Sequence, residues 1–103
     1  MSLDSVEIPG NPVKVKGNNN LHEIFMFAIS TCQWCKKGKQ WLEERGYAYT
    51  YLDIDKLEFE VKEELKSNLR KVFETRLTFP FLIVDRTQCH PGFTPSDWEV
   101  MLS

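Results

Sequence analysis

The sequence predicts an α/β domain in which a four-stranded mixed sheet is flanked by three helices. Strand-like and helix-like segments alternate in the order β-α-β-α-β-β-α from residue 21 onward. A helix between the first two strands implies that these strands are parallel and joined by a right-handed crossover. The last two strands are close in the sequence and should form an antiparallel hairpin. The length of 103 residues suits one such domain.

The expected strands are short apolar or alternating segments. In the second segment, Tyr49 and Tyr51 would share one face of the strand. Pro80 precedes the third segment, and Asp85-Arg86 can turn the chain between the third and the fourth. The four segments are Glu23–Ile29, Tyr47–Asp53, Phe81–Val84 and Thr87–His90.

Helical periodicity and end signals predict the three helices. Residues 31–45 have helical spacing of large side chains, and Gly46 stands where a helix stops. Asp55-Lys56-Leu57-Glu58 matches a capping box, which predicts that the second helix begins there. Thr94-Pro95-Ser96-Asp97 predicts the start of the last helix, with threonine as the cap and proline at the first helical position. The apolar stripe of the second helix comprises Leu57, Val61, Leu65, Leu69 and Val72.

The first twenty residues differ from the rest. Proline, glycine and asparagine recur there as turn signals. Val13-Lys14-Val15-Lys16 alternates as a short edge strand would. We therefore interpret residues 1–20 as an N-terminal tail or a short appended ribbon, and residues 21–103 as the domain.

Composition and charge exclude several classes of function. The 13 basic and 15 acidic residues give a net charge of -2, without the basic excess that is typical of nucleic-acid-binding domains. No apolar run approaches the ~20 residues of a membrane span. The N-terminus lacks the basic segment and apolar stretch of a secretory signal. These features predict a cytoplasmic domain that binds neither nucleic acid nor membranes.

Two of the three cysteines form a C-x-x-C motif, Cys32-Gln33-Trp34-Cys35. In a chain without a secretory signal, this spacing is typical of redox or metal sites rather than of structural disulfides. The further candidate zinc ligands Cys89 and His90 are adjacent on an expected strand, so their side chains would point to opposite faces. The pattern therefore favours redox chemistry, with a zinc site as the alternative.

The position of the motif explains why it suits disulfide exchange. Cys32 follows a strand and precedes a helix, where free N–H groups and the helix dipole favour a thiolate. The thiolate is the form that attacks a disulfide. Cys35 lies one turn further on the same face of the helix. We predict that Cys32 attacks a substrate disulfide and that Cys35 resolves the mixed disulfide. Cys89 is interpreted as a small apolar bystander.

The order of motifs resembles the glutaredoxin family. A strand precedes Cys32-Gln33-Trp34-Cys35, Thr78-Phe79-Pro80 precedes another strand, and a glycine turn at Gly92 precedes the last helix. The resemblance covers residues 21–103. It implies a thioredoxin-like fold, with Cys32 as nucleophile, Cys35 as resolving thiol and Pro80 as a cis-proline. The residues that it places in contact with substrate are Thr31, Gln33, Trp34, Thr78, Phe79, Pro80, Gly92 and Phe93.

The sequence departs from the family where glutathione would bind. Glutaredoxins usually carry a lysine at the position of Ile29, which helps to hold a glutathione carboxylate. They also carry a second glycine where this chain has Phe93, and an aspartate one residue before Asp97. The run Gly92-Phe93-Thr94-Pro95 instead resembles the glutaredoxin-like redoxins that supply electrons to ribonucleotide reductase. Those proteins are commonly recharged by thioredoxin reductase, and Gln33 also fits that group.

The resemblance therefore implies a monomeric electron carrier that reduces protein disulfides, such as one in ribonucleotide reductase. It implies no tightly bound cofactor and no metal. Electrons would come from glutathione or from a thioredoxin-reductase-type donor. The alternatives are a glutathione-dependent glutaredoxin and a module that binds zinc or an iron–sulfur cluster. The presence of Cys35 argues against the cluster, because the iron–sulfur members mostly have a single-cysteine motif.

Overall fold

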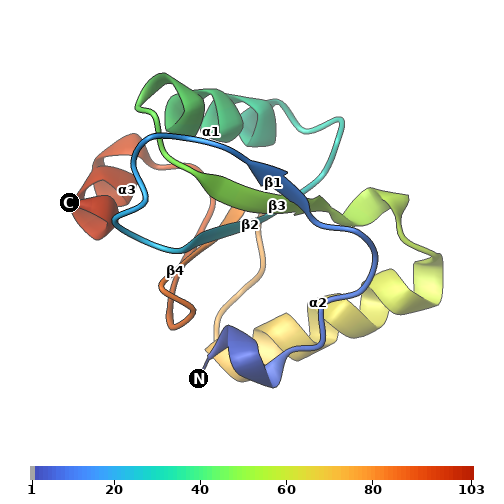
Figure 1. Cartoon of the computed structure of the whole chain (residues 1–103). Coiled ribbons are helices and arrows are strands. Elements are labelled where there is room, and N and C mark those ends of the chain that lie inside the picture. Colours follow the sequence, from blue (N-terminus) through green and yellow to red (C-terminus); the bar gives the residue numbers. More distant parts are fainter. Residues whose placement is uncertain (1) are drawn as a thin grey trace.

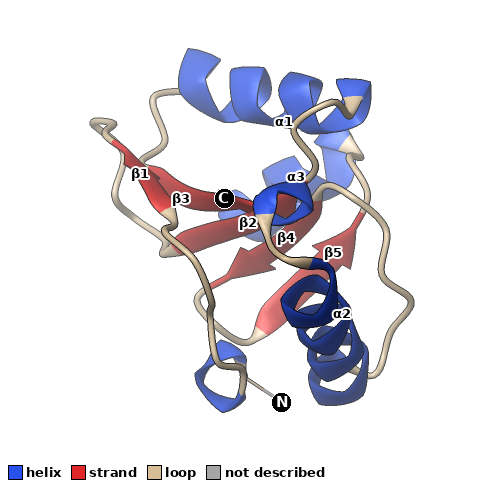
Figure 2. Cartoon of the chain, turned by 90° about the vertical axis from the view of Figure 1, so that its right-hand side faces the viewer, coloured by secondary structure: helices blue, strands red, loops and turns tan. Residues whose placement is uncertain are grey.

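The computed structural model describes residues 2–103 and has the three layers of a thioredoxin-like fold (Figure 1). A mixed sheet lies between α1 and α3 on one face and α2 on the other, which Figure 2 shows from the side. The strands are β1 (Val13–Val15), β2 (Ile24–Ala28), β3 (Tyr49–Asp53), β4 (Phe81–Val84) and β5 (Gln88–Pro91). The helices are α1 (Gln33–Glu44), α2 (Phe59–Phe73) and α3 (Pro95–Leu102), with short 3-10 turns η1 (Leu3–Ser5) and η2 (Ile54–Lys56).

The sheet has the strand order β1-β3-β2-β4-β5. The parallel pairing of β2 with β3 and the antiparallel hairpin of β4 with β5 confirm the predicted pairings. In the parallel register, Ala28 at the end of β2 lies opposite Asp53 at the end of β3. The chain leaves β2 toward α1 at this end of the two strands. Residues that follow the two strands are therefore brought together there.

The sheet has five strands, one more than the four predicted. The additional strand is β1, which pairs antiparallel with the outer edge of β3. It lies within residues 1–20, in the alternating segment that is compatible with an edge strand. Three residues are too few for alternation alone to establish a strand, and pairing with β3 supplies the hydrogen bonds that hold it.

The predicted start of the second helix is wrong. α2 begins at Phe59, because Ile54–Lys56 form the separate turn η2. The Asp55 carboxylate accepts hydrogen bonds from Ser30 and does not cap the helix. The N-cap residue Glu58 makes no side-chain capping bond. The Asp55 side chain therefore bonds to a residue that is distant in sequence, and not to the helix N-terminus that the capping-box pattern predicts. The α2 side chains that are buried are Leu65, Leu69 and Phe73, whereas Val61 is exposed.

Several other element ends differ from prediction by one or two residues, whereas β4 matches its predicted bounds. α1 begins at Gln33, because Cys32 is its extended N-cap residue. β3 begins at Tyr49, and Tyr47 makes only an isolated bridge to Asn19. At α3, Thr94 is the N-cap residue and Pro95 begins the helix, but the threonine side chain makes no capping bond. Such differences are usual, because helix and strand ends fray.

Two apolar clusters cover the faces of the sheet. The first joins the sheet to α1 and α3 through residues that include Trp41, Leu42, Trp98 and Leu102. The second joins it to α2 and to the N-terminal turn, where Leu3 and Val6 are buried. Figure 1 shows that turn, in dark blue, beside α2. Within residues 2–103, no helix combines the length and apolar character that a membrane span requires.

Candidate active site

Cys32 stands at the junction between β2 and α1. The N–H group of Cys32 donates to the Ile29 carbonyl oxygen at 3.0 Å, which closes the turn that leads into the helix. As N-cap residue, Cys32 has extended backbone angles, and its Sγ accepts a hydrogen bond from the Cys35 N–H at 3.3 Å. The side chain is partly accessible. A partly accessible sulfur thus lies at the positive end of a 12-residue helix.

Cys35 has the opposite environment, because its side chain is fully buried. Its Sγ accepts a hydrogen bond from the Ile29 N–H at 3.5 Å. Burial, followed by the hydrogen bond with Cys32, raises the pKa of the Cys35 thiol to about 12. The Cys35 thiol is therefore protonated at neutral pH.

The turn before Cys32 is held by a residue that sequence reasoning missed. Asp55, in η2, accepts from the Ser30 N–H at 2.9 Å and from the Ser30 hydroxyl at 2.5 Å. The hydrogen bond from the Ser30 hydroxyl lowers the pKa of Asp55 below its usual range. Asp55 sits within a sequence pattern that resembles a helix cap, so no local signal indicated this contact.

Pro80 lies against the same helix. The Phe79–Pro80 peptide bond is cis, as the resemblance implied. Gly38 lies one turn after Cys35, and a Cβ atom there would lie 3.4 Å from Pro80 Cγ and 2.9 Å from Trp98 Cη2. Only a glycine lets α1 approach Pro80 and Trp98 this closely. The first half of α1 therefore packs directly on the Phe79–Pro80 loop.

Gly92 joins the Pro80 loop to the start of α3. Its N–H donates to the Pro80 carbonyl oxygen at 2.8 Å, and its own carbonyl oxygen accepts from Trp98 Nε1 at 3.1 Å. Its φ of 84° lies in the left-handed region that favours glycine. A Cβ atom at Gly92 would lie 3.7 Å from the Thr78 Oγ1 atom. Thr78, Pro80 and Gly92 are thus neighbours in space.

The remaining predicted contact residues divide into exposed and packed side chains. Thr31, Gln33 and Trp34 flank Cys32 and are exposed, with 57% of Trp34 accessible. The ammonium of Lys37 lies 4.5 Å from the centre of the Trp34 ring. Phe79, by contrast, is half-buried and contacts both apolar clusters.

Phe93 and Asp97 are both engaged within the protein. The Phe93 ring packs edge-on against Trp98 at a centroid distance of 4.8 Å. The Asp97 Oδ2 atom lies 3.1 Å from Nε2 of His90, and Nδ1 of the same imidazole lies 3.1 Å from the Gly92 carbonyl oxygen. Phe93, in the turn before α3, and Asp97, in the first turn of α3, thus both have partners within the protein.

The sequence model of the glutaredoxin family matches residues 23–88, a segment that contains both Cys32 and Cys35. The chain belongs to the glutaredoxin family. This is a family of thiol–disulfide oxidoreductases. A search of the curated proteins found no significant match.

Solved structures of two glutaredoxins and of a methanoredoxin have the same fold as this chain. The glutaredoxin from Methanosarcina mazei Go1 is 26% identical, with a TM-score of 0.72 over 91% of this chain and 89% of that chain. Methanoredoxin from Methanosarcina acetivorans is 28% identical, with a TM-score of 0.65 over 79% of this chain and 84% of that chain. The glutaredoxin from Archaeoglobus fulgidus, at 22% identity and a TM-score of 0.66 over 80% and 87% of the two chains, shows the fold alone.

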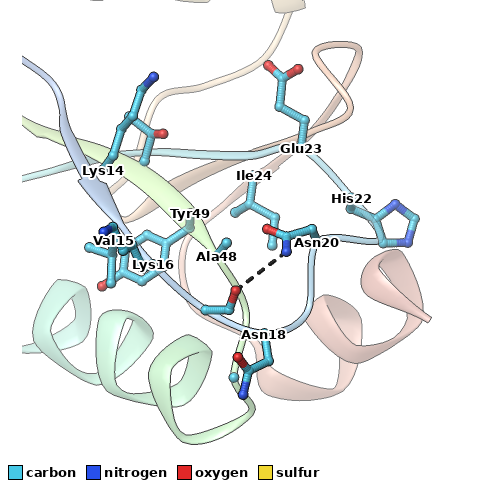
Figure 3. Close-up of a pocket in the computed structure, with 13 residues that line it drawn as sticks. Lys14, Val15, Lys16, Asn18, Asn20, His22, Glu23, Ile24, Ala48 and Tyr49 are labelled. Atoms are coloured by element: carbon cyan, nitrogen blue, oxygen red, sulfur yellow. Dashed lines mark hydrogen bonds between the residues drawn. The ribbon is translucent and has the colours of Figure 1, made fainter.

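A separate hollow of about 840 Å³ lies at the other end of β2, beside the start of β3 (Figure 3). Lys14, Lys16 and His22 are among its lining residues, and none of the predicted contact residues lines it. The Asn20 side-chain amide donates to the Gly17 carbonyl oxygen at 3.5 Å across its rim. Within residues 2–103, no three His, Cys, Asp or Glu side chains lie close enough to share a metal ion.

Proposed function

We propose that this glutaredoxin-family chain is a dithiol–disulfide oxidoreductase in which Cys32 is the nucleophile and Cys35 the resolving thiol. The supporting observation is the contrast between the two sulfurs. Cys32 is accessible at a helix N-terminus, whereas Cys35 is buried one turn behind it and keeps its proton. A substrate disulfide can reach the first sulfur and not the second.

The reaction would proceed in two exchanges. The Cys32 thiolate attacks one sulfur of the substrate disulfide, and the other substrate sulfur leaves as a thiolate that takes up a proton. Cys35 then loses its proton and attacks the Cys32 sulfur of the mixed disulfide, which releases the second substrate thiol. The substrate gains two electrons, and the chain ends with a Cys32–Cys35 disulfide that an external dithiol must reduce.

We infer that the substrate lies across the adjacent loops. Thr78, Phe79 and Pro80 would contact it on one side of Cys32, and the turn at Gly92 and Phe93 would extend that surface. On the other side Thr31, Gln33 and Trp34 are exposed for contact. The hydrogen bond between Gly92 and Pro80, at 2.8 Å, supports a single surface made from both loops.

Turnover of three single-cysteine variants tests the assignment. We expect Cys32→Ser to abolish reduction of a protein disulfide, because no nucleophile remains at the surface. Cys35→Ser should lose sustained dithiol turnover but still react once. Cys89→Ser is the matched control, since it removes a half-buried sulfur on β5 and should turn over at the wild-type rate. Wild-type turnover by Cys32→Ser would contradict the proposal.

We further propose that a thioredoxin-reductase-type donor recharges this chain better than glutathione does. The apolar side chain of Ile29 cannot form an ion pair with a glutathione carboxylate. The Phe93 ring packs against Trp98, and the Asp97 carboxylate contacts the His90 imidazole. Charge-assisted hydrogen bonds contribute roughly 1.5–3 kcal/mol each. The loss of two of them would weaken glutathione binding by about a hundredfold or more, at tenfold per 1.4 kcal/mol. The disulfide of ribonucleotide reductase is one protein substrate that this grouping suggests.

A steady-state comparison of two donor systems tests this preference. The chain is supplied with NADPH and thioredoxin reductase, or with NADPH, glutathione and glutathione reductase, at equal protein concentration. We expect the first system to support faster turnover. Faster turnover with glutathione would identify the alternative, a glutathione-dependent glutaredoxin, and would leave the roles of the two cysteines unchanged.

A further inference from the structure

The resolving step requires that a buried thiol lose its proton. Cys35 is fully buried and its pKa is raised to about 12, so the thiolate needed for attack is rare at neutral pH. Part of that rise comes from the hydrogen bond and the charge of Cys32. Both influences end once the Cys32 sulfur is bonded to substrate. Burial then opposes ionisation of Cys35, while the Ile29 N–H and the charge of Lys39 favour it.

Lys39 is a partly buried lysine on the same helix as Cys35. It lies four positions after Cys35 on α1, and residues at this spacing share a face of a helix. Its ammonium is 3.1 Å from the Asp53 Oδ1 atom and 3.9 Å from the centre of the Tyr51 ring. Only 19% of the Lys39 side chain and 11% of the Asp53 side chain are accessible. The Lys39 ammonium is therefore held between α1 and β3. The ammonium of a surface lysine, by contrast, would extend into solvent.

The register of the sheet places the Lys39–Asp53 ion pair at the ends of β2 and β3, beside which the Cys35 sulfur also lies. Asp53 is the last residue of β3 and lies opposite Ala28. The next residue after Ala28 is Ile29, whose N–H donates to Cys35 Sγ. The sulfur and the ion pair thus lie between the same end of the sheet and the first turns of α1.

We propose that Lys39, held in place by Asp53, is a positioning residue that promotes deprotonation of Cys35 in the resolving step. The inference rests on the proposed function, in which Cys35 resolves the mixed disulfide. The Cys35 proton leaves to solvent, the Cys35 sulfur forms a bond to the Cys32 sulfur, and the bond between Cys32 and the substrate sulfur breaks. The fixed positive charge stabilises the developing Cys35 thiolate without contacting the substrate.

The surrounding titratable groups are consistent with this role. On α1 the ionisable groups that act on Cys35 are Cys32 and Lys39. β3 contributes Asp53 and Tyr51, both of which contact the Lys39 ammonium. η2 contributes Lys56, whose ammonium lies 3.9 Å from the other Asp53 oxygen, and Asp55, whose carboxylate accepts hydrogen bonds from Ser30. Asp53 is thus shared between Lys39 and the more exposed Lys56, and the charge of Lys39 lowers the pKa of Cys35.

Release of a chromophoric thiol isolates the resolving step. The reduced chain, in a Cys89→Ser background, reacts with one equivalent of Ellman's reagent. Attack by Cys32 releases the first thionitrobenzoate, and attack by Cys35 releases the second, which stopped-flow absorbance follows as a separate phase. We expect Lys39→Met to slow the second phase about tenfold at neutral pH and to displace its pH–rate profile upward by about one unit, since tenfold corresponds to one pK unit.

Two further variants separate charge from structure. Lys39→Arg keeps a cation and should restore most of the rate of the second phase. Lys37→Met removes the same charge from the same helix, at an exposed position beside Trp34, and should leave the profile unchanged. A wild-type profile in Lys39→Met, an equal shift in Lys37→Met, or failure of Lys39→Arg to restore the rate would overturn the inference. Absence of the second phase in the otherwise wild-type chain would instead overturn the role of Cys35, and the inference with it.

Discussion

At the scale of single residues, the cysteine environment depends on atoms that are distant in sequence. The C-x-x-C spacing places both sulfurs at a helix start, and this much follows from the pattern. The burial of Cys35 against β2 and the support of the preceding turn by Asp55 follow only from tertiary packing. Two residues of the same type, three positions apart, acquire different solvent accessibility in this way.

The contact between Asp55 and Ser30 gives a prediction with a defined pH dependence. The hydrogen bonds from Ser30 lower the pKa of Asp55 in the folded chain. The stability that they contribute is therefore present above the unfolded-state value, near 4, and is lost as pH falls through the lower folded-state value. We expect Asp55→Ala to lower the free energy of unfolding by about 1 kcal/mol at neutral pH, because the pair is exposed.

Urea denaturation at a series of pH values measures this contribution. The difference between wild type and Asp55→Ala should shrink toward the acidic end of the series. Ser30→Ala should produce a similar loss, and the double variant should lose little more, because the two side chains act together. An unfolding free-energy difference that is independent of pH would contradict the assignment of the effect to the Asp55 carboxylate.

At the scale of elements, α1 begins after Cys32, contains Cys35 and packs closely on its neighbours at Gly38. Gly38 lets it approach Trp98 and Pro80. Replacement by alanine improves helix propensity by about 1 kcal/mol. The new Cβ atom, however, would lie 2.9 Å from Trp98 Cη2, so the helix or the tryptophan must move.

We expect Gly38→Ala to destabilise the fold by about 1–3 kcal/mol despite the better propensity, as overpacking of a filled core usually does. Disulfide reduction should also slow, because α1 moves away from the Phe79–Pro80 loop. Gln40→Ala is the control on the exposed face of the same helix and should leave both quantities unchanged. Thermal unfolding and turnover measure the two effects. A Gly38→Ala chain more stable than wild type would show that the space beside Gly38 is not filled.

How far each element could be predicted depends on whether local and tertiary signals agree. β4 matches its apolar run residue for residue, and α3 begins at the proline that its sequence indicates. The start of α2 could not be predicted, because Asp55 bonds to a serine on another loop. The fifth strand could be suspected from Val13-Lys14-Val15-Lys16, but only pairing with β3 makes it a strand.

At the scale of the whole molecule, the sequence was sufficient for the fold class and for the motif order around the cysteines. The same reasoning could not foresee that Phe93 packs on Trp98, or that His90 engages Asp97. Those contacts join β5, the turn after it and α3, and no periodicity in the sequence encodes them. The proposed preference for an electron donor rests on these contacts.

The N-terminal segment gives a prediction at this scale. Leu3 is 1% exposed and packs in the cluster that includes α2, whereas Leu21 is 72% exposed. We expect Leu3→Ala to lower the free energy of unfolding by about 2–5 kcal/mol, the range for a buried leucine. Leu21→Ala removes the same atoms and should change it by less than about 0.5 kcal/mol. Urea denaturation distinguishes the two, and equal small effects would show that residues 1–20 behave as a tail.

Identification of the cysteine that bonds to substrate when the resolving thiol is absent tests the central proposal most directly. Cys35→Ser is mixed with a disulfide-containing peptide and quenched in acid, and the adduct is located by peptide mass spectrometry. We expect a one-to-one mixed disulfide on Cys32, stable because the second exchange is blocked. Cys32→Ser, treated in the same way, should form no adduct at Cys35, since that sulfur is buried. An adduct on Cys89 in place of Cys32, or a rapid adduct on Cys35, would contradict the assigned roles.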